Sequence, residues 1–175
     1  METTKWAIDP THSEIGFKVK HMMFTNVSGK FEKFDATVET EDEHFENAKI
    51  EFTADAESIS TGSVDRDTHL RSADFFDVAT FPKITFQSTS FKRKGDEYEL
   101  IGDFTLHGVT KTISLPVEFG GFGKDPWGNT KAGFSISGKL NRKDFGLNWN
   151  AALEAGGVLV GEEVKLSIEL QLIKK

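Results

Sequence analysis

The 175-residue sequence contains no cysteine, which excludes a disulfide framework, a thiol nucleophile and a cysteine-ligated zinc site. No run approaches the roughly 18 consecutive apolar residues of a membrane-spanning helix. Residues 1–8 lack the apolar core of a signal peptide. We therefore expect no stable membrane insertion and a cytoplasmic location, or a periplasmic one if the chain is a trimmed mature form.

Basic residues are in the minority, with 21 Lys and Arg against 28 Asp and Glu, a net charge of −7 and a pI near 5.3. The one basic run, Lys92–Lys94, is followed directly by Gly95-Asp96-Glu97 and is typical of a solvated hairpin tip. A protein that binds nucleic acid needs a basic stripe or patch. The sequence therefore predicts no nucleic-acid partner.

Tyrosine is nearly absent, because one Tyr accompanies 16 Phe in a chain whose apolar fraction is 37%. Each phenyl ring buries a large area and brings no hydroxyl group that needs a partner. This composition suits either a filled core or an apolar pocket.

Apolar and polar residues alternate with period two through most of the chain, which is the pattern of half-buried strands. The clearest case is the C-terminal segment, where Val164, Leu166 and Ile168 alternate with charged and polar residues. About eight such strands follow one another, and several of about 11 residues would be roughly 35 Å long. Long amphipathic antiparallel strands close into a barrel because closure removes exposed edges. We therefore predict an all-β fold, with residues 1–175 forming one antiparallel β-barrel domain.

The long segment from Ser63 to Gln87 departs from this alternation. Ser63 is a good helix N-cap, and Asp65 and Asp67 place negative charge in the first turn, where the helix dipole favours it. The pattern predicts a short helix over about Val64–Ser72, with Pro82 preventing its continuation. A lone helix inserted in an all-β chain is expected to be a plug or lid at one end of the barrel.

Three local signals describe the connections between strands. A slip in the alternation predicts a β-bulge near Glu32-Lys33. Gly95-Asp96 is expected to form a two-residue hairpin turn. Pro116 indicates an interrupted hydrogen-bond ladder, and the glycine-rich loop that follows is expected to place Trp127 at a tip.

Six sequence blocks resemble the YceI-like, polyisoprenoid-binding family, in the right order and over almost the whole chain. They are WAIDPTHSEIGFKVKH (6–21), VSGKF (27–31), RDTHLRSADFFD (66–77) with FPKITF (81–86), LHGVTK (106–111), NRKDFG (141–146) and VGEEV (160–164). The resemblance implies an extended, lipocalin-like barrel whose elongated apolar pore holds a polyisoprenoid, such as an isoprenoid quinone or prenyl phosphate, for transport or storage. Many members of the family are exported and linked to acid stress, and the resemblance is compatible with a homodimer.

The side chains that face inward by alternation would line this pore. We predict as ligand-binding Ile15, Phe17, Val19, Phe31, Phe52, Phe86, Leu100, Phe104, Phe134, Ile136, Leu166 and Ile168, and the same faces carry Ile50, Ile84, Leu115, Val117 and Val164. A dry core is the alternative for each of them. Small residues on these faces are expected to leave room inside: Gly29, Ala54, Ala56, Ser88, Gly102, Ala132 and Gly138.

A polar head group would lie at the mouth of the pore. The candidates there are Arg66, His69, Arg71, Phe75 and Phe76, since the cations could meet a phosphate or a carbonyl oxygen. The alternative is structural, with Arg66, Asp67, Arg71 and Asp74 forming a surface ion-pair network that fastens the insertion to the barrel. Arg142 and Asp144 are expected to pin the irregular segment from 141 to 157.

The sequence predicts a binder rather than an enzyme, with no catalytic residue, metal site or cofactor. His12 and His21 differ in strand parity and would make poor co-ligands for a metal. Three alternatives stay open: a binder of fatty acid or fatty amide amphiphiles, a small-molecule enzyme that uses His12 or His107 near the mouth, and a filled barrel that docks a partner through Trp127. The five histidines could also respond to acid.

Overall fold

The part of the chain that this computed structural model describes, residues 3–41, 44–154 and 156–175, contains eleven β-strands, one α-helix and three short 3₁₀-helices. The strands are β1 (Thr3–Ile8), β2 (Glu14–His21), β3 (Thr25–Phe31), β4 (Phe34–Glu41), β5 (His44–Asp55), β6 (Ile59–Ser60), β7 (Lys83–Lys94), β8 (Glu97–Leu106), β9 (Val109–Lys124), β10 (Thr130–Asn141) and β11 (Val160–Lys174). The helix α1 spans Val64–Arg71, and the 3₁₀-helices are η1 (Pro10–His12), η2 (Ala56–Ser58) and η3 (Arg142–Phe145).

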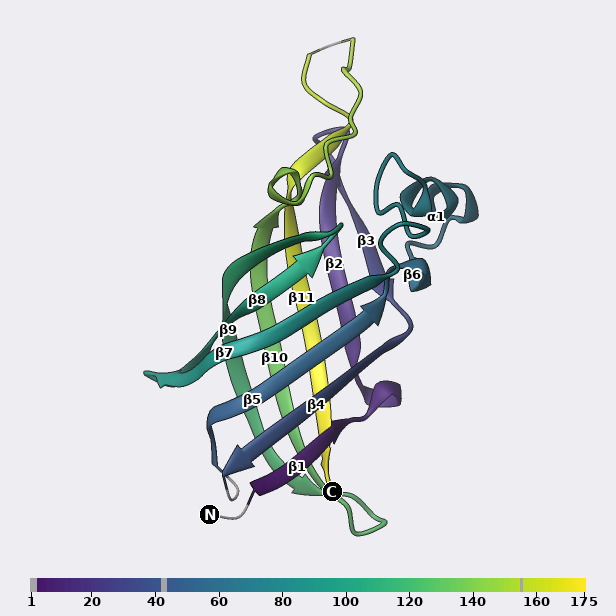
Figure 1. Cartoon of the computed structure of the whole chain (residues 1–175). Helices are drawn as coiled ribbons and strands as arrows, with labels where there is room; N and C mark the ends of the chain where they lie inside the picture. The colour runs from purple at the N-terminus through teal and green to yellow at the C-terminus, as the bar shows by residue number, and fades with distance from the viewer. Residues whose placement is uncertain (1–2, 42–43, 155) are drawn as a thin grey trace.

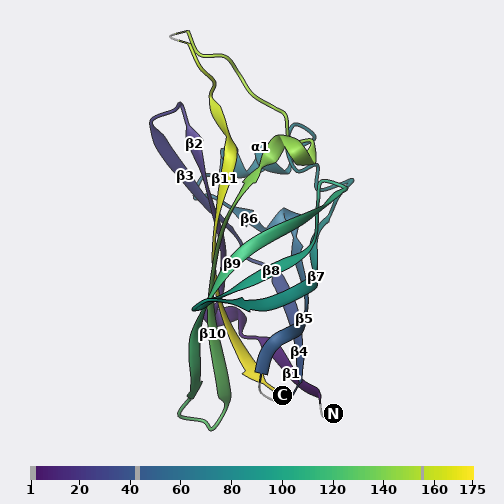
Figure 2. The same cartoon turned by 90° about the vertical axis from the view of Figure 1, so that its left-hand side faces the viewer.

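Eight of these strands close into an antiparallel barrel in the order β1-β4-β5-β7-β8-β9-β10-β11 (Figure 1). The ring is closed by β1 and β11, where Ile8 pairs with Leu172. The predicted lipocalin-like barrel is therefore confirmed. Both termini lie at one end, called the lower end here, and α1 lies beside the other, upper end (Figures 1 and 2).

At three neighbouring places in the barrel wall, one strand ends halfway along the barrel and a different strand continues above it. This arrangement, and not the predicted β-bulge, explains the slip in alternation at Glu32-Lys33. The upper part of β11 pairs with β2 and its lower part with β1, so β2, β3 and β6 continue the wall above β1, β4 and β5. Glu32 and Lys33 form a bend between β3 and β4 rather than an extra residue in one strand. The neighbouring strand breaks at the same level, since Glu32 N donates to Ser58 O and Asp55 N donates to Lys33 O. The slip in alternation therefore marks a change of pairing partners.

The helix forms where the capping residues place it. The Ser63 hydroxyl accepts a hydrogen bond from Arg66 N at 3.3 Å, and Asp65 and Asp67 lie in the first turn. The helix ends at Arg71, with Ser72 as its C-cap, one residue earlier than predicted. It packs beside the upper barrel and does not enter it (Figure 1).

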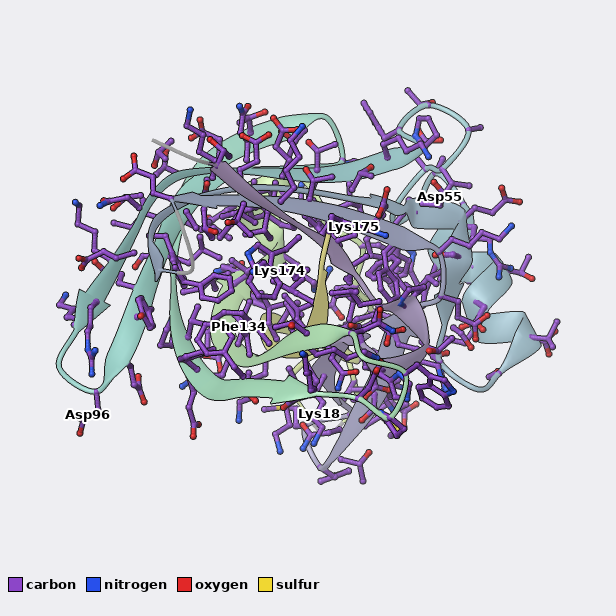
Figure 3. All side chains as sticks on the ribbon, turned by 90° about the horizontal axis from the view of Figure 1, so that it is seen from below. Lys18, Asp55, Asp96, Phe134, Lys174 and Lys175 are labelled. Atoms are coloured by element: carbon purple, nitrogen blue, oxygen red, sulfur yellow. The ribbon has the colours of Figure 1, made fainter. Side chains whose placement is uncertain are left out.

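The hairpin predictions are confirmed. Gly95-Asp96 joins β7 to β8, with Lys94 paired to Glu97 and Gly95 at φ +66°. Asp96 lies well outside the ring of strands in the view from below, whereas Phe134 lies within it (Figure 3). Trp127 is 82% exposed at the β9–β10 turn.

Pro116 marks the place where β9 and β10 separate. The β9–β10 ladder includes every pair from Lys124↔Thr130 to Val117↔Ile136 and ends there. The adjacent residue of β9 is Pro116, which has no N–H group to continue the ladder. The pairing of β9 with β8 goes on past this point, including Pro116↔Glu99. The interruption predicted at Pro116 is therefore found on the β10 side only.

Candidate functional site

A cavity of about 590 Å³ runs inside the barrel. Ligand cavities in proteins commonly measure about 300–1,000 Å³. Along β11 the lining extends from Val160 to Leu172, which corresponds to about 40 Å at about 3.3 Å per residue. The cavity is therefore long and narrow, with the shape of a chain rather than of a compact molecule.

The structure brings the predicted pore residues together on this cavity. All twelve line it: Ile15, Phe17, Val19, Phe31, Phe52, Phe86, Leu100, Phe104, Phe134, Ile136, Leu166 and Ile168. The five further inward residues also line it: Ile50, Ile84, Leu115, Val117 and Val164. Period-two alternation was a sufficient signal here, because every one of these residues lies on a regular strand.

Sequence reasoning missed several lining residues, for different reasons. Val38 and Leu172 lie on the same alternating faces and could have been found by extending the parity farther along β4 and β11. Phe91 also lines the cavity, but a register shift between Ser88 and Ser90 changes the parity of β7 before it, so alternation from Ile84 and Phe86 does not reach it. Phe145 and Trp149 also line the cavity but belong to the irregular connection after β10, where no periodicity identifies an inward face.

Three of the small inward residues do not open space, which corrects the role predicted for them. A Cβ atom added at Gly102 would overlap the Phe86 ring, one at Gly138 would overlap the Leu115 side chain, and one at Gly29 would overlap the Phe17 ring. Each glycine therefore lets a large neighbour lie flat across its strand. These glycines allow the lining side chains to lie close against the barrel wall, which keeps the centre of the barrel open.

Aromatic side chains close the lower end of the barrel. Trp6 and Phe45 are 2% and 3% exposed, with ring centroids 5.1 Å apart. Phe45 also contacts Phe119, Phe122 and Phe134 at 5.6, 5.6 and 4.9 Å. Phe45 and Phe134 form part of the cavity lining, so this cluster is the floor of the cavity.

The polar lining residues gather at the upper end. They are Lys20, His21, Thr61, Asp65, Arg66, His69 and Arg142, all on or beside α1, the end of β2 and the start of η3. The cavity therefore has two different ends, an aromatic floor below and a polar mouth above.

Four of the five predicted mouth residues line the cavity: Arg66, His69, Phe75 and Phe76. The His69 ring lies edge-on to Trp149 and Phe75, with centroids 4.7 and 5.1 Å away, and His69 Nε2 lies 2.9 Å from an Asp74 carboxylate oxygen. Arg66 Nε and Nη2 donate to the hydroxyl and carbonyl oxygens of Thr61 at 2.7 and 2.8 Å.

Arg71 is the exception, since it is not part of the lining. Its guanidinium donates to Glu57 O at 2.9 Å and Ile59 O at 3.3 Å, so it points back to the barrel wall below α1. Arg66 and Arg71 are five residues apart on one helix, so their side chains leave the axis in different directions and do not reach the same surface.

The insertion is fastened to the barrel, but mainly through backbone groups rather than through the predicted ion-pair network. The buried Asp67 carboxylate accepts hydrogen bonds from Thr61 N at 2.9 Å and Thr61 Oγ1 at 2.6 Å. Of the four residues proposed for the network, Asp74 contacts a basic side chain, and that side chain is His69. Strand β6 and the residues around it therefore hold the helix in place.

Arg142 is a buried cation in the wall of the mouth. It is 4% exposed, and it donates to the carbonyl oxygens of Leu147, Trp149 and Gly161 at 2.6–2.9 Å and of Val160 at 3.3 Å. Burial lowers the pKa of its guanidinium, and Glu162 opposes this. Its predicted structural role is confirmed, whereas Asp144 is exposed.

The mouth carries an excess of positive charge. Lys20, Arg66 and Arg142 line it together with one carboxylate, that of Asp65. This excess contrasts with the net charge of −7 of the whole chain. A negatively charged or strongly electronegative group would be stabilised there.

The two candidate catalytic histidines, His12 and His107, are not part of the cavity lining. His12 belongs to η1 and contacts Asp9, with Nδ1 and Oδ2 2.8 Å apart. His107 lies at the β8–β9 turn, where Nδ1 is 3.1 Å from Phe145 O and the ring packs on Phe81 at 4.8 Å. Among the described residues, no group of three His, Asp or Glu side chains is arranged to hold a metal ion.

A closed antiparallel barrel with a long apolar cavity, one aromatic floor and one polar mouth defines a lipocalin-like architecture. A family model described as "YceI-like domain" matches residues 6–172, and the chain belongs to this family. A UPF0312 protein of Staphylococcus aureus is 39% identical over 163 residues, which are 93% of each chain.

Two solved structures share the fold. One is Burkholderia cenocepacia BcnA, with a TM-score of 0.81 and 23% identity over 94% of this chain and 98% of that one. The other is a polyisoprenoid binding domain from Saccharophagus degradans, with a TM-score of 0.67 and 14% identity over 97% and 98% of the two chains. Within the described part of this chain, no helix has the length and apolar character needed to cross a bilayer.

Proposed function

We propose that this protein binds a long-chain apolar lipid, most favourably a polyisoprenoid, and sequesters or carries it without chemical change. The observation that carries this proposal is the cavity whose lining extends along β11 from Val160 to Leu172, and which is apolar along its length and polar at one end. Such a shape matches a molecule with a long tail and a single head group. The name of the Saccharophagus degradans domain supports the choice of a polyisoprenoid, as an analogy between proteins of the same fold.

The tail would lie with its end against the floor at Phe45 and Phe134. Each buried methylene gains about 0.8 kcal/mol, so an isoprene unit of five carbons gains about 4 kcal/mol before any opposing terms. Ordering a flexible chain and removing its free motion offset most of this gain. A dissociation constant in the micromolar to nanomolar range is expected for a tail that fills the cavity.

The head group would lie among Arg66, His69 and Arg142, against the rings of Phe75 and Phe76. Arg142 joins the predicted mouth residues because the structure places it on the same surface. A phosphate or a quinone carbonyl can accept a hydrogen bond from Arg66, and a charged acceptor gains more than a neutral one. The buried Arg142 already donates to four backbone carbonyl oxygens and contributes its positive charge. The prenyl phosphate type of ligand is therefore favoured over a prenyl alcohol.

Titration of the purified, delipidated protein with octaprenyl monophosphate tests the proposal, with palmitate as the competing amphiphile. The expected result is saturable binding with one ligand per chain, weaker binding of palmitate, and recovery of the lipid unchanged. Saturable binding of palmitate alone would replace the polyisoprenoid by a fatty-acid ligand. Absence of saturable binding of either compound, or a chemically altered lipid, would overturn the proposal.

A further inference from the structure

Four apolar side chains are exposed together beside the mouth. They are Met22, Met23, Phe24 and Val158, with exposed fractions of 40%, 61%, 79% and 39%. We call this group the apolar tip. Met22 to Phe24 form the β2–β3 turn and Val158 lies in the segment before β11, at the end of the barrel opposite to both termini (Figures 1 and 2).

The two parts of the apolar tip are held against each other. Met22 N donates to Leu159 O at 2.7 Å, and a Cβ atom added at Gly157 would overlap the Met23 sulfur atom. The tip is therefore a single surface built from two chain segments.

The turn keeps its methionines at an energetic cost. Met22 and Met23 have φ values of +51° and +65°, in the left-handed region that Gly or Asn would occupy more easily. A non-glycine residue in this region is disfavoured by about 1–2 kcal/mol. Exposed apolar side chains in strained backbone positions are a feature of surfaces that bind something.

The apolar tip is continuous with the cavity. His21, which precedes Met22, and Leu159, which follows Val158, both line the cavity, as does Val27 on the other side of the turn. A molecule that leaves or enters through the mouth therefore passes directly beside the tip.

The β2–β3 hairpin behind the tip is basic, whereas the adjacent start of β11 carries Glu162 and Glu163, which are paired with Lys143 and Lys139. Residues 15–31 contain Lys18, Lys20 and Lys30 and no Asp or Glu, in a chain with a net charge of −7. These lysines are exposed and lie by alternation on the outward face of β2 and β3, and Lys18 is paired with Lys165 of β11. Lys20, near the upper end of β2, also borders the cavity mouth. In the described part of the chain, none of Lys18, Lys20 and Lys30 lies in an ion pair. An apolar end with lysines a few residues behind it is the pattern of segments that lie in the interface of an anionic bilayer.

We propose that the apolar tip inserts into the surface of an anionic lipid bilayer and holds the cavity mouth against it. Phe24 and Met23 enter the headgroup region, and Lys18 and Lys20 stay close enough to the surface to interact with lipid phosphates. This inference rests on the proposed function for its purpose, since it provides the route by which a lipid enters the cavity. The membrane contact itself does not depend on which lipid the cavity holds.

Flotation with vesicles of phosphatidylcholine and phosphatidylglycerol tests this proposal. The double variant Met23→Ser/Phe24→Ser removes the two most exposed side chains of the tip, and serine, like methionine, is a non-glycine residue, so the strain of the turn backbone stays nearly unchanged. Trp127→Ser is the matched control, because Trp127 is equally exposed at the other end of the barrel. Octaprenyl monophosphate binding by the double variant, measured in detergent without vesicles, separates a failure of docking from a failure of the proposed function.

The wild-type protein is expected to float with the anionic vesicles, less with pure phosphatidylcholine and less at high salt. The double variant is expected to bind the vesicles about tenfold more weakly, with solution affinity for the lipid within about twofold of wild type, while Trp127→Ser behaves as wild type. No vesicle binding by the wild-type protein, or equal binding by the double variant, would overturn the proposal. A wild-type dimer that the double variant abolishes, without vesicle binding, would overturn it too and assign the tip to self-association.

Discussion

A tryptophan at Ile168 is expected to shorten the tail that the cavity accepts. Ile168 lies on β11 opposite Ile136 and Ile15 and lines the cavity. The lining from Val160 to Ile168 corresponds to about 26 Å, against about 40 Å from Val160 to Leu172. An indole at this position would therefore block about the last third of the cavity.

The effect should appear as a change in chain-length dependence. If each isoprene unit retains about 1 kcal/mol after the entropic costs, affinity rises about fivefold per unit until the tail reaches the floor. The wild-type affinity is expected to level off with a tail of about 40 Å, and that of Ile168→Trp with a tail about one-third shorter. Short tails are expected to bind both proteins alike.

The assay is displacement of a fluorescent lipid by prenyl monophosphates of two to ten isoprene units. Ser167→Trp is the matched control, because Ser167 is the adjacent residue on the outward face of the same strand. Overpacking costs about 1–3 kcal/mol, so the melting temperature of each variant is measured first. A folded Ile168→Trp protein with the wild-type chain-length profile would refute the placement of the tail along β11.

Four further predictions follow from named contacts. Arg66→Gln should weaken binding of a prenyl phosphate about tenfold and binding of the matching prenol about twofold or less, because a hydrogen bond to a charged group is worth about 1.5–3 kcal/mol. The same displacement assay measures both affinities, and equal losses would contradict a head group at Arg66. Arg142→Met should lower the free energy of unfolding by about 3 kcal/mol in urea titration, since four backbone carbonyl groups lose their donor. A loss below about 1 kcal/mol would be inconsistent with a structural role for Arg142. Gly102→Ala should destabilise by about 1–3 kcal/mol, since the added Cβ meets the Phe86 ring and the Gln87 carbonyl oxygen, whereas Gly123→Ala, where a Cβ meets nothing within 4 Å, should cost less. Asp9→Asn should destabilise the folded protein by about 3 kcal/mol near neutral pH. The reason is that the buried Asp9 carboxylate receives hydrogen bonds from Lys131 at 2.7 Å and from Thr11, and lies 2.8 Å from His12 Nδ1.

The pH dependence of the Asp9 prediction follows from the direction of its pKa shift. The hydrogen bond from Lys131, aided by His12 and Thr11, holds the pKa of Asp9 well below its ordinary value. A depressed pKa in the folded protein contributes stability that is fully present above the unfolded-state pKa, about 3.9, and is lost as the pH falls toward the folded-state value. The stability difference between wild type and Asp9→Asn should therefore be constant above about pH 5 and shrink below about pH 4 in urea titrations. A difference that grows on acidification would contradict the assignment.

The sequence was informative wherever a strand is regular. Alternation identified the barrel and all twelve predicted pore residues, since a period of two assigns every second side chain to one face. Ser63, Asp65 and Asp67 located the helix to within one residue, because capping is a local interaction. These features depend on near neighbours in the chain.

The features that the sequence did not reveal depend on distant segments. The bend at Glu32-Lys33 looked like a bulge because its cause, the matching break at Ser58 in the neighbouring strand, lies 26 residues away. Arg142 and Trp149 reach the mouth through an irregular connection, in which alternation says nothing about direction. The direction of Arg71 is set by the carbonyl groups of Glu57 and Ile59, which only the folded chain brings near it.

Native mass spectrometry of the protein, purified without detergent from cells that make polyisoprenoids, tests most directly whether the hollow interior is the functional part. We predict a population heavier than the polypeptide by the mass of one long-chain lipid, released as an intact isoprenoid on collisional activation and reduced in Ile168→Trp but not in Ser167→Trp. Only unliganded mass in the wild-type protein, together with no uptake of added octaprenyl monophosphate, would contradict the account.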